Sequence, residues 1–239
     1  MRVDVALTAE LAAREPLTDR HAVVVDTLRA SSTIVSALAA GAEGVLPVED
    51  LDEARTRARE LDAVLGGERG AQAVEGFDLG NSPSTYDAAT VAGRMVVLTT
   101  TNGTRAVAGL RAARSIRAGC FLNAEATARA LVDDGAEDVL VVACGRRGAV
   151  SADDVAAAGC IAGSLLLMAA GEPADGARVA IALFDAWKHD LHGLLKRCAA
   201  GRNLASLGLG DDLPDCARVD LAPVVARLDD SGVFRSGTA

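Results

Sequence analysis

The feature that most constrains the fold of this chain is a repeated alternation between short apolar runs and longer segments with helical periodicity. In the first run, residues 21–26, three consecutive valines favour an extended backbone that is buried on both faces. Further strand-like runs lie at residues 44–48, 63–67, 94–100, 115–121 and 138–144. Helical patterns lie at residues 31–42, from Asp50 onward, and at residues 103–113, 123–134, 151–170 and 178–200. This alternation predicts an α/β fold with a parallel or mixed β-sheet core and helices on both faces.

The composition and the absence of linkers predict a single compact unit. Half of the 239 residues are hydrophobic and 24% are charged, so the chain can bury a core and disorder is not expected. No Pro-, Gly- or Ser-rich linker divides the sequence. We therefore expect residues 1–239 to form one compact α/β unit, in which two sub-lobes would meet near residues 90–100. The tail from Asp211 mixes polar turns with apolar residues at 219, 221, 224 and 225, which favours a returning pair of strands.

Charge and cysteine usage narrow the class of protein. The chain has 33 acidic and 24 basic residues, a net charge of −9, so nucleic acid is not an expected partner. The five cysteines are scattered without a C-x-x-C pair, which indicates reduced thiols in a cytoplasmic protein. The longest apolar stretch, residues 160–170, is too short to cross a bilayer, and the N-terminus lacks an apolar signal core. We expect a soluble, cytoplasmic protein with no membrane partner.

Polar residues follow most of the strand-like runs. They lie at residues 26–29, 68–69, 99–102, 123 and 145–148. Because ligands of open α/β sheets bind beyond the carboxyl ends of the strands, parallel strands would bring these residues to one rim. A rim of acids, amides, hydroxyls and arginines suits a metal ion together with an anionic ligand. Common nucleotide-binding and serine-hydrolase sites are disfavoured, since no Walker A loop, G-x-S-x-G elbow or G-x-G-x-x-G after the first strand is present.

The segment at residues 26–33, Asp-Thr-Leu-Arg-Ala-Ser-Ser-Thr, is the first candidate for chemistry. Asp26 ends an apolar strand, where an isolated charge is costly, so its carboxylate should have a cation partner. Three hydroxyl residues then open a helix whose free N–H groups attract anions. The alternative interpretation is that Ser31 or Ser32 only caps the helix and that Asp26 belongs to an ordinary turn.

The segment at residues 99–105, Thr-Thr-Thr-Asn-Gly-Thr-Arg, repeats this arrangement, and Gly103 allows close approach of the backbone to a ligand. The alternative here is a tight Asn-Gly turn. Two hydroxyl-rich helix starts predict two anionic groups on one ligand. Between them, the glycine-rich loop at residues 66–83 carries three acids whose oxygens suit Mg²⁺, although acidic loop residues are otherwise simply solvated. These acids are Glu68, Glu75 and Asp78.

Four ordered motifs give the chain a family resemblance. They are residues 26–33, Gly66-Gly-Glu-Arg69, residues 75–83 (Glu-Gly-Phe-Asp-Leu-Gly-Asn-Ser-Pro) and residues 99–105. Together they resemble the 2-phosphosulfolactate phosphatase family, and Ser151-Ala-Asp-Asp154 followed by Ala158-Gly159 is similar to a later motif of that family. The resemblance extends over residues 3–167 and is faint in the tail. One departure is Thr27, where the family pattern leads us to expect an aliphatic residue.

The resemblance implies a reaction, a cofactor and a set of site residues. The family hydrolyses (R)-2-phospho-3-sulfolactate to 3-sulfolactate and phosphate with Mg²⁺, a step toward coenzyme M in methanogens. Asp26, Arg29 and Asn102 are then the expected catalytic residues, and Asp26, Glu68 and Asp78 the expected Mg²⁺ ligands. Substrate binding is expected from Ser32, Thr33, Arg69, Thr101, Thr104, Arg105 and Asn123. The expected partners are a small anionic phosphorylated substrate and a second copy of the chain, in a homodimer.

Two other functions are compatible with the same rim. One is a phosphatase that acts on another small 2-phospho acid. The other is a protein that binds an anionic metabolite without catalysis, although carboxylates beside the predicted anion sites count against it. For a phosphatase, the sequence also leaves open whether the nucleophile is water or Asp26 itself.

Overall fold

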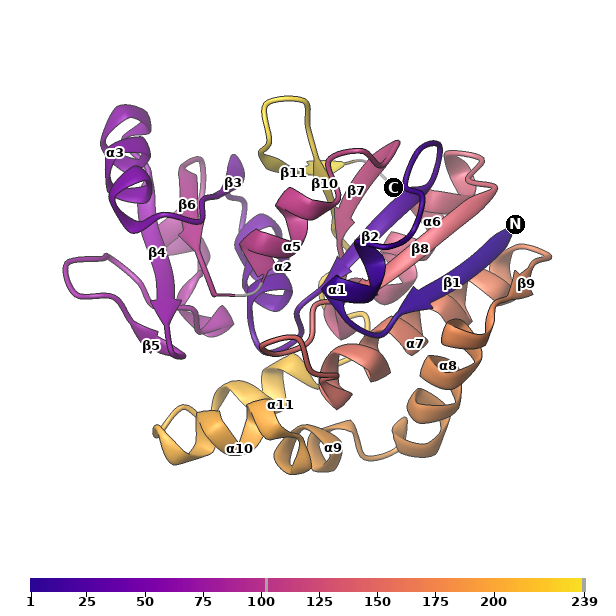
Figure 1. Ribbon diagram of the computed structural model, residues 1–239. Coiled ribbons are helices and arrows are strands. Elements are labelled where there is room, and N and C mark those ends of the chain that lie inside the picture. The colour runs from indigo at the N-terminus through magenta and orange to yellow at the C-terminus, as the bar shows by residue number, and fades with distance from the viewer. Residues whose placement is uncertain (102, 238–239) are drawn as a thin grey trace.

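The computed structural model describes residues 1–101 and 103–237. Its strands form one mixed sheet of 11 strands in the order β5-β4-β6-β3-β11-β10-β7-β2-β8-β1-β9 (Figure 1). In chain order they are β1 (Arg2–Ala6), β2 (His21–Val25), β3 (Gly44–Pro47), β4 (Val64–Arg69), β5 (Gln72–Ala73), β6 (Met95–Thr99), β7 (Ser115–Ala118), β8 (Asp138–Ala143), β9 (Glu172–Pro173), β10 (Val225–Leu228) and β11 (Phe234–Gly237). The predicted α/β fold with a mixed sheet is therefore confirmed.

The sheet consists of two parallel groups joined by a hairpin. Strands β3, β6 and β4 are mutually parallel, and β7, β2, β8, β1 and β9 form the second parallel group. The hairpin of β10 and β11 lies between them and is antiparallel to β7 on one side and to β3 on the other. The first group comes from residues 44–99. The second group combines β1 and β2, which precede that segment in the sequence, with β7, β8 and β9, which follow it. The division into sub-lobes near residues 90–100 stays a prediction.

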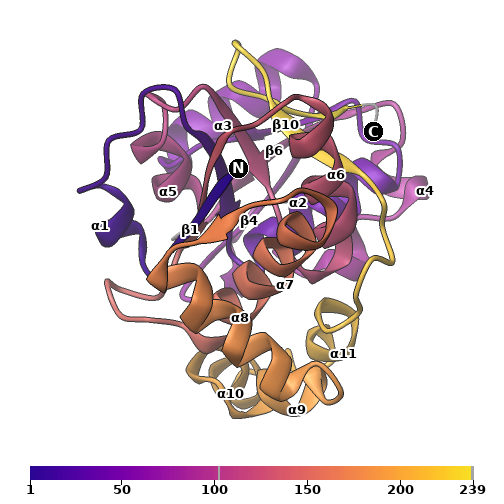
Figure 2. The ribbon, with the colours of Figure 1, turned by 90° about the vertical axis from the view of Figure 1, so that its right-hand side faces the viewer.

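Helices cover both faces of the sheet, as the sequence predicted. They are α1 (Ala9–Ala12), α2 (Ala30–Ala39), α3 (Leu51–Leu61), α4 (Ala88–Val91), α5 (Gly103–Gly109), α6 (Ala124–Asp133), α7 (Ala152–Met168), α8 (Asp175–Trp187), α9 (Leu191–Arg197), α10 (Ala199–Ser206) and α11 (Asp212–Cys216). On one face of the sheet lie α1, α2, α4 and α5. The opposite face is covered by α6 to α9 over the second parallel group and by α3 over the first parallel group. Figures 1 and 2 place α9, α10 and α11 together at one end of the molecule.

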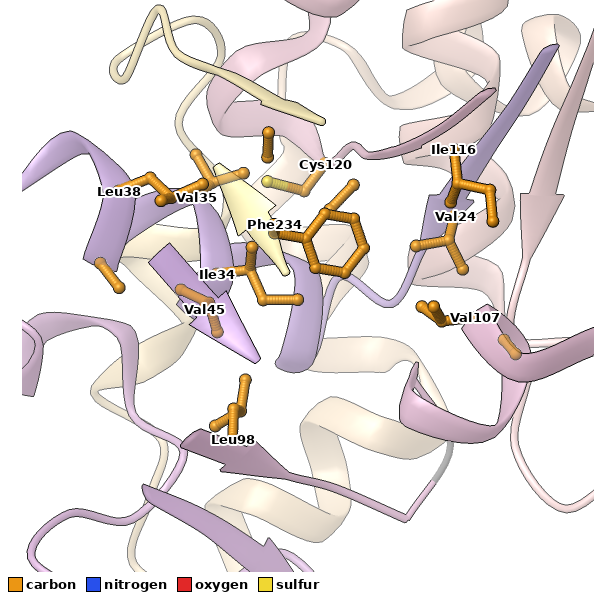
Figure 3. Packing of buried hydrophobic residues seen from close by; sticks show 14 of the residues in the cluster. Val24, Ile34, Val35, Leu38, Val45, Leu98, Val107, Ile116, Cys120 and Phe234 are labelled. Carbon is orange, nitrogen blue, oxygen red and sulfur yellow. The ribbon is translucent and has the colours of Figure 1, made fainter. Parts of the chain in front are cut away.

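The core follows directly from strand alternation. In β2, Ala22 and Val24 belong to one buried cluster while Val23 and Val25 belong to another, because successive side chains point to opposite faces. Figure 3 shows the first cluster, in which Phe234 of the hairpin lies among residues of α2 and both parallel groups. A strand buried on both faces explains why the apolar run at residues 21–25 is uninterrupted.

The structure differs from the sequence prediction in three segments. Strand β1 was not predicted, because its alternating Arg-Val-Asp-Val sequence lacks a continuous apolar run. The helix predicted at residues 178–200 is broken by Asp190, whose side chain accepts a hydrogen bond from the N–H of Gly193 and caps α9. The returning strand pair lies later than predicted, at residues 225–228 and 234–237.

Among the described residues, no helix is both long and apolar enough to cross a membrane. The cytoplasmic location and the dimer stay predictions.

Candidate functional site

A pocket lies where the carboxyl ends of four strands meet. Residues that follow or end β2, β4, β6 and β8 line it, and the first turn of α7 and one face of α10 complete its wall. The lining residues include Asp26, Leu28, Arg29, Glu68, Gly70, Ala71, Asn81, Thr100, Thr101, Gly145, Arg146, Arg147, Ser151, Asp153, Asp154, Ala200, Asn203 and Leu204. The predicted rim therefore exists, and it draws on both parallel groups of the sheet.

Asp26 lies at the end of β2, where the first turns of α2 and α5 meet it. Its Oδ1 accepts a hydrogen bond of 3.3 Å from the N–H of Ala30 in α2. A Cβ at Gly103 would lie 3.2 Å from Asp26 Oδ2 and 2.8 Å from the Cβ of Ala30, so α5 can begin there only with glycine. Burial raises the pKa of Asp26 to about 7, and the negative charges of Asp153 and Glu68 act in the same direction.

Asp153 and Asp154, in the first turn of α7, add two buried carboxyl groups. Asp154 bridges two strand ends, since it accepts hydrogen bonds from the N–H of Thr27 at 2.8 Å and from the N–H of Gly145 at 3.0 Å. Asp153 accepts a 2.6 Å hydrogen bond from the hydroxyl of Ser151. Burial raises the pKa of both carboxyls, and for Asp154 the charge of Asp153 raises it further. Both residues line the pocket, and the two backbone hydrogen bonds of Asp154 hold the ends of β2 and β8 together.

Glu68 connects the ends of β4 and β6. Its Oε1 accepts from the N–H of Thr101 at 2.7 Å, and its Oε2 accepts from the N–H of Ala71 at 2.6 Å. Both carboxylate oxygens are thus fixed by backbone donors in the pocket wall. This arrangement agrees with the predicted placement of Glu68 beside Asp26.

Arg29 lines the pocket, but other protein groups already bind its guanidinium. Its Nη1 donates to Asp212 of α11 at 2.7 Å and to the hydroxyl of Ser82 at 3.1 Å, and its Nη2 donates to the carbonyl of Ala71 at 2.6 Å. Ser82 in turn donates to Asp212. Arg29 and Asp212 are both buried, so this ion pair joins β2, the loop after β4 and the C-terminal helices.

Four predicted ligand residues have side chains bonded to the fold itself. Asp78 accepts a 2.9 Å hydrogen bond from the N–H of Leu65 and does not line the pocket, so it is not placed with Asp26 and Glu68. The guanidinium of Arg69 donates to the carbonyls of Glu68 and Glu49 and to the hydroxyl of Thr99. Ser32 and Thr33, which are fully buried, donate to the carbonyls of Thr27 and Asn81.

Asn123 is also a structural residue rather than part of the pocket lining. Its amide accepts from the N–H of Cys120 and donates to the carbonyls of Ala118 and Val224, which joins β7 to the segment before β10. The sequence placed it on the rim because it follows a strand-like run. The structure instead shows a short 3-10 turn, Phe121–Asn123, that carries it into the interior.

The residues predicted after β6 separate into two places. Thr101 lines the pocket, and Thr104 is buried, with its hydroxyl donating to the carbonyl of Thr100. Arg105 lines a neighbouring pocket with Glu10 and Arg147 between α1 and α5. Asn102, predicted as a catalytic residue, lies outside the described residues.

Several pocket residues were absent from the predicted site. Asp153 and Asp154 belong to a motif that was recognised but not assigned a role, and Arg146 and Arg147 lie on the predicted rim. Asn81, in the third motif, and Asn203, on α10, carried no local signal for chemistry. Only the fold brings these residues, from distant parts of the chain, to one pocket.

The pocket suits a hard cation in its donor chemistry. The described residues contain no group of three or more Asp, Glu, His or Cys side chains arranged to hold a metal. Mg²⁺, however, usually takes one or two carboxylates and keeps several waters. Asp26 with Glu68 or Asp153 meets that requirement. Burial first, and then the charges of Asp153 and Glu68, raise the pKa of Asp26, and a bound cation would offset both effects.

Buried carboxyls, together with the half-buried Arg146 and the exposed Arg147, give this α/β protein a pocket whose chemistry suits a small charged ligand. Residues 6–231 match the family model described as 2-phosphosulpholactate phosphatase. A probable 2-phosphosulfolactate phosphatase of Gloeobacter violaceus is 40% identical over 243 aligned positions, which cover all of both chains. A protein of the same name from Caldanaerobacter subterraneus is 36% identical over 92% of this chain and 92% of its own length. Another from Clostridium acetobutylicum is also 36% identical, over 98% of this chain and all of its own length. The chain belongs to the 2-phosphosulfolactate phosphatase family.

Proposed function

We propose that this chain is a phosphoric monoester hydrolase that converts (R)-2-phospho-3-sulfolactate into 3-sulfolactate and phosphate. Family membership supports the reaction. The observation that carries the proposal is Asp26, a buried carboxyl that lines a polar pocket beside Glu68 and Asp153 and whose pKa is raised to about 7. Carboxyls perturbed by burial and by specific charged neighbours cluster at catalytic sites.

Magnesium is the proposed cofactor. Asp26 with Glu68 or Asp153 would hold it, and the ion would polarise the phosphoryl oxygens and offset their negative charge. Asp154 would keep its present partners, the N–H groups of Thr27 and Gly145, and so fix the two strand ends relative to each other.

The protein side chains divide the remaining tasks between the ends of the pocket. Arg146 and Arg147 follow β8 at the more exposed end, where their guanidinium groups can bind the sulfonate and carboxylate. Asp26 faces the phosphoryl group at the buried end. In one mechanism its carboxylate positions an attacking water. In the other, Asp26 Oδ attacks phosphorus, the bond from phosphorus to the C2 oxygen breaks, and the departing oxygen takes a proton from water. A water molecule then cleaves the bond between Asp26 Oδ and phosphorus, which releases phosphate and restores the Asp26 carboxylate.

The test is phosphate release from 2-phosphosulfolactate by the full chain, with Mg²⁺ and with EDTA. We expect turnover that EDTA abolishes, and Asp26→Asn should reduce activity by a factor on the order of a hundred or more, as expected for several kcal/mol of transition-state stabilisation. Circular dichroism should show that the variant is folded. Turnover by Asp26→Asn at the parent rate would exclude both roles of Asp26, and faster turnover of another 2-phospho acid would change the proposed substrate.

A further inference from the structure

Helix α8 packs on the rest of the molecule through one side only. It contacts α7 and the edge strands β1 and β9, and Gly159 of α7 meets it so closely that a Cβ there would overlap the carbonyl group of Ala180. Figure 2 shows α8 lying across the side of the molecule that faces the viewer, in front of α7. The opposite side of α8 is exposed along the length of the helix.

The exposed side of α8 carries a stripe with heptad spacing. Four exposed residues follow one another at intervals of four, three and four positions: Asp175, Val179, Ala182 and Ala186. A mean period of 3.5 residues keeps such a stripe facing a partner helix. Val179 is 54% exposed, and the two alanines are small enough to let a second helix backbone approach closely.

Two charged residues flank the stripe in positions that complement each other. Arg178 precedes Val179, and Asp185 precedes Ala186, so the two charges occupy the same heptad position one repeat apart. Within the described part of the chain Arg178 forms no ion pair, and Asp185 is paired only with the exposed Lys188, at 3.0 Å. The cation and the anion are therefore both accessible to a partner.

The spacing of these charges fits an antiparallel pair of α8 helices. If Val179 packs on Ala182 of a second copy, Arg178 lies opposite Asp185 of that copy, because the equivalent flanking positions of two antiparallel heptads meet across the interface. A two-fold axis repeats both contacts in the opposite sense. The same register places Asp175 opposite Lys188 of the second copy.

We propose that the exposed side of α8 is the contact surface between two copies of this chain, which associate about a two-fold axis with their α8 helices antiparallel. Two reciprocal ion pairs between Arg178 and Asp185 fix the register, and Val179 and Ala182 form the apolar centre. Because α8 has 13 residues and is about 20 Å long, it buries less than the roughly 800 Å² per partner of a typical stable interface. The dimer should therefore dissociate on dilution. None of these residues lines the pocket, so the inference is independent of the proposed function.

The test is sedimentation equilibrium of the full chain over a dilution series. We expect a reversible equilibrium between monomer and dimer in the parent. Arg178→Asp and Asp185→Arg should each weaken association by about tenfold or more, since either change turns both ion pairs into repulsive pairs. An equimolar mixture of the two variants should form dimers again. The double variant, which keeps the net charge of −9, should also associate like the parent.

Arg57→Asp and Glu60→Arg are the matched controls, because they reverse the charges of an exposed ion pair on α3 and should leave association unchanged. Circular dichroism should show that every variant is folded. The proposal would be overturned by a parent that stays monomeric at every concentration, or by a dimer that neither α8 variant weakens. It would equally be overturned if the mixture of the two variants stayed monomeric.

Discussion

Asp26 destabilises the cation-free fold whenever it is ionised. Its pKa rises from 3.8 to about 7, first because burial disfavours the carboxylate and then because of the charges of Asp153 and Glu68. A group whose pKa is raised by folding binds more protons in the folded state than in the unfolded state. The free energy of unfolding is therefore highest, with respect to this group, below pH 3.8, where Asp26 is protonated in both states. It falls as the pH rises toward 7, because the unfolded state then loses its proton before the folded state does.

Replacing Asp26 by asparagine should remove this pH dependence. In EDTA at pH 8, we expect Asp26→Asn to melt several degrees higher than the parent, because the neutral amide avoids a buried charge. The difference should shrink toward zero near pH 4, where the parent carboxyl is protonated. Calorimetry over this pH range measures it, with the exposed substitution Asp52→Asn as control. A variant that melts lower than the parent at pH 8 would mean that other contacts favour the Asp26 carboxylate.

Side-chain direction decides which of the predicted site residues line the pocket. Glu68 and Arg69 are adjacent at the end of β4, and the sequence placed both in the site. Successive side chains on a strand point to opposite sides, so Glu68 lines the pocket while Arg69 bonds away from it to Glu49 and Thr99. Position at a strand end could thus be predicted, but orientation could not, because it depends on the register of the neighbouring strands.

At the scale of elements, features with local causes were predictable. The helical pattern predicted from Asp50 onward is α3, and the Asp50 side chain caps it by accepting from the N–H groups of Asp52 and Glu53. Helices α10 and α11 were not predicted, and their contribution to the site depends on distant contacts. The buried pair of Arg29 and Asp212 joins residues 183 positions apart. No local pattern around Asp212 marks it as the partner of a strand-end arginine.

This pair should hold the C-terminal helices against the pocket. We expect Arg29→Ala or Asp212→Ala to cost about 3–5 kcal/mol in urea unfolding, because each leaves a buried charge unpaired. The double variant should cost less than the sum of the two. Hydrogen exchange should also increase in α9 to α11 before the rest of the chain.

The exposed pair of Arg57 and Glu60 on α3 provides the matched control, since Glu60→Gln should cost less than about 1 kcal/mol. Additive costs in the Arg29 and Asp212 variants would show that the two residues contribute independently.

At the scale of the whole molecule, the β10–β11 hairpin decides whether the two parallel groups behave as one unit. Its residue Phe234 is fully buried, pairs with Val45 of β3, and packs with Val24 of β2 and Leu98 of β6 in one cluster (Figure 3). A core shared in this way favours a single cooperative transition, since neither group can lose the hairpin without exposing apolar surface. The sequence could not predict this connection, because the hairpin is the last element of the chain yet lies mid-sheet.

The chain supplies one natural optical probe near each group, and these probes test that cooperativity. Its one tyrosine, Tyr86, is buried beside β4, and its one tryptophan, Trp187, ends α8 on the second group. We expect urea unfolding followed by Tyr86 near-ultraviolet signals and by Trp187 fluorescence to give coincident transitions.

Phe234→Ala should lower the free energy of unfolding by about 3–5 kcal/mol at both probes, because it leaves a cavity in the shared core. Phe77→Ala, a half-buried substitution in a separate cluster beside α3, should cost less. If Phe234→Ala shifted the Tyr86 transition alone, the molecule would consist of two sub-lobes that unfold separately, with the hairpin serving only the first.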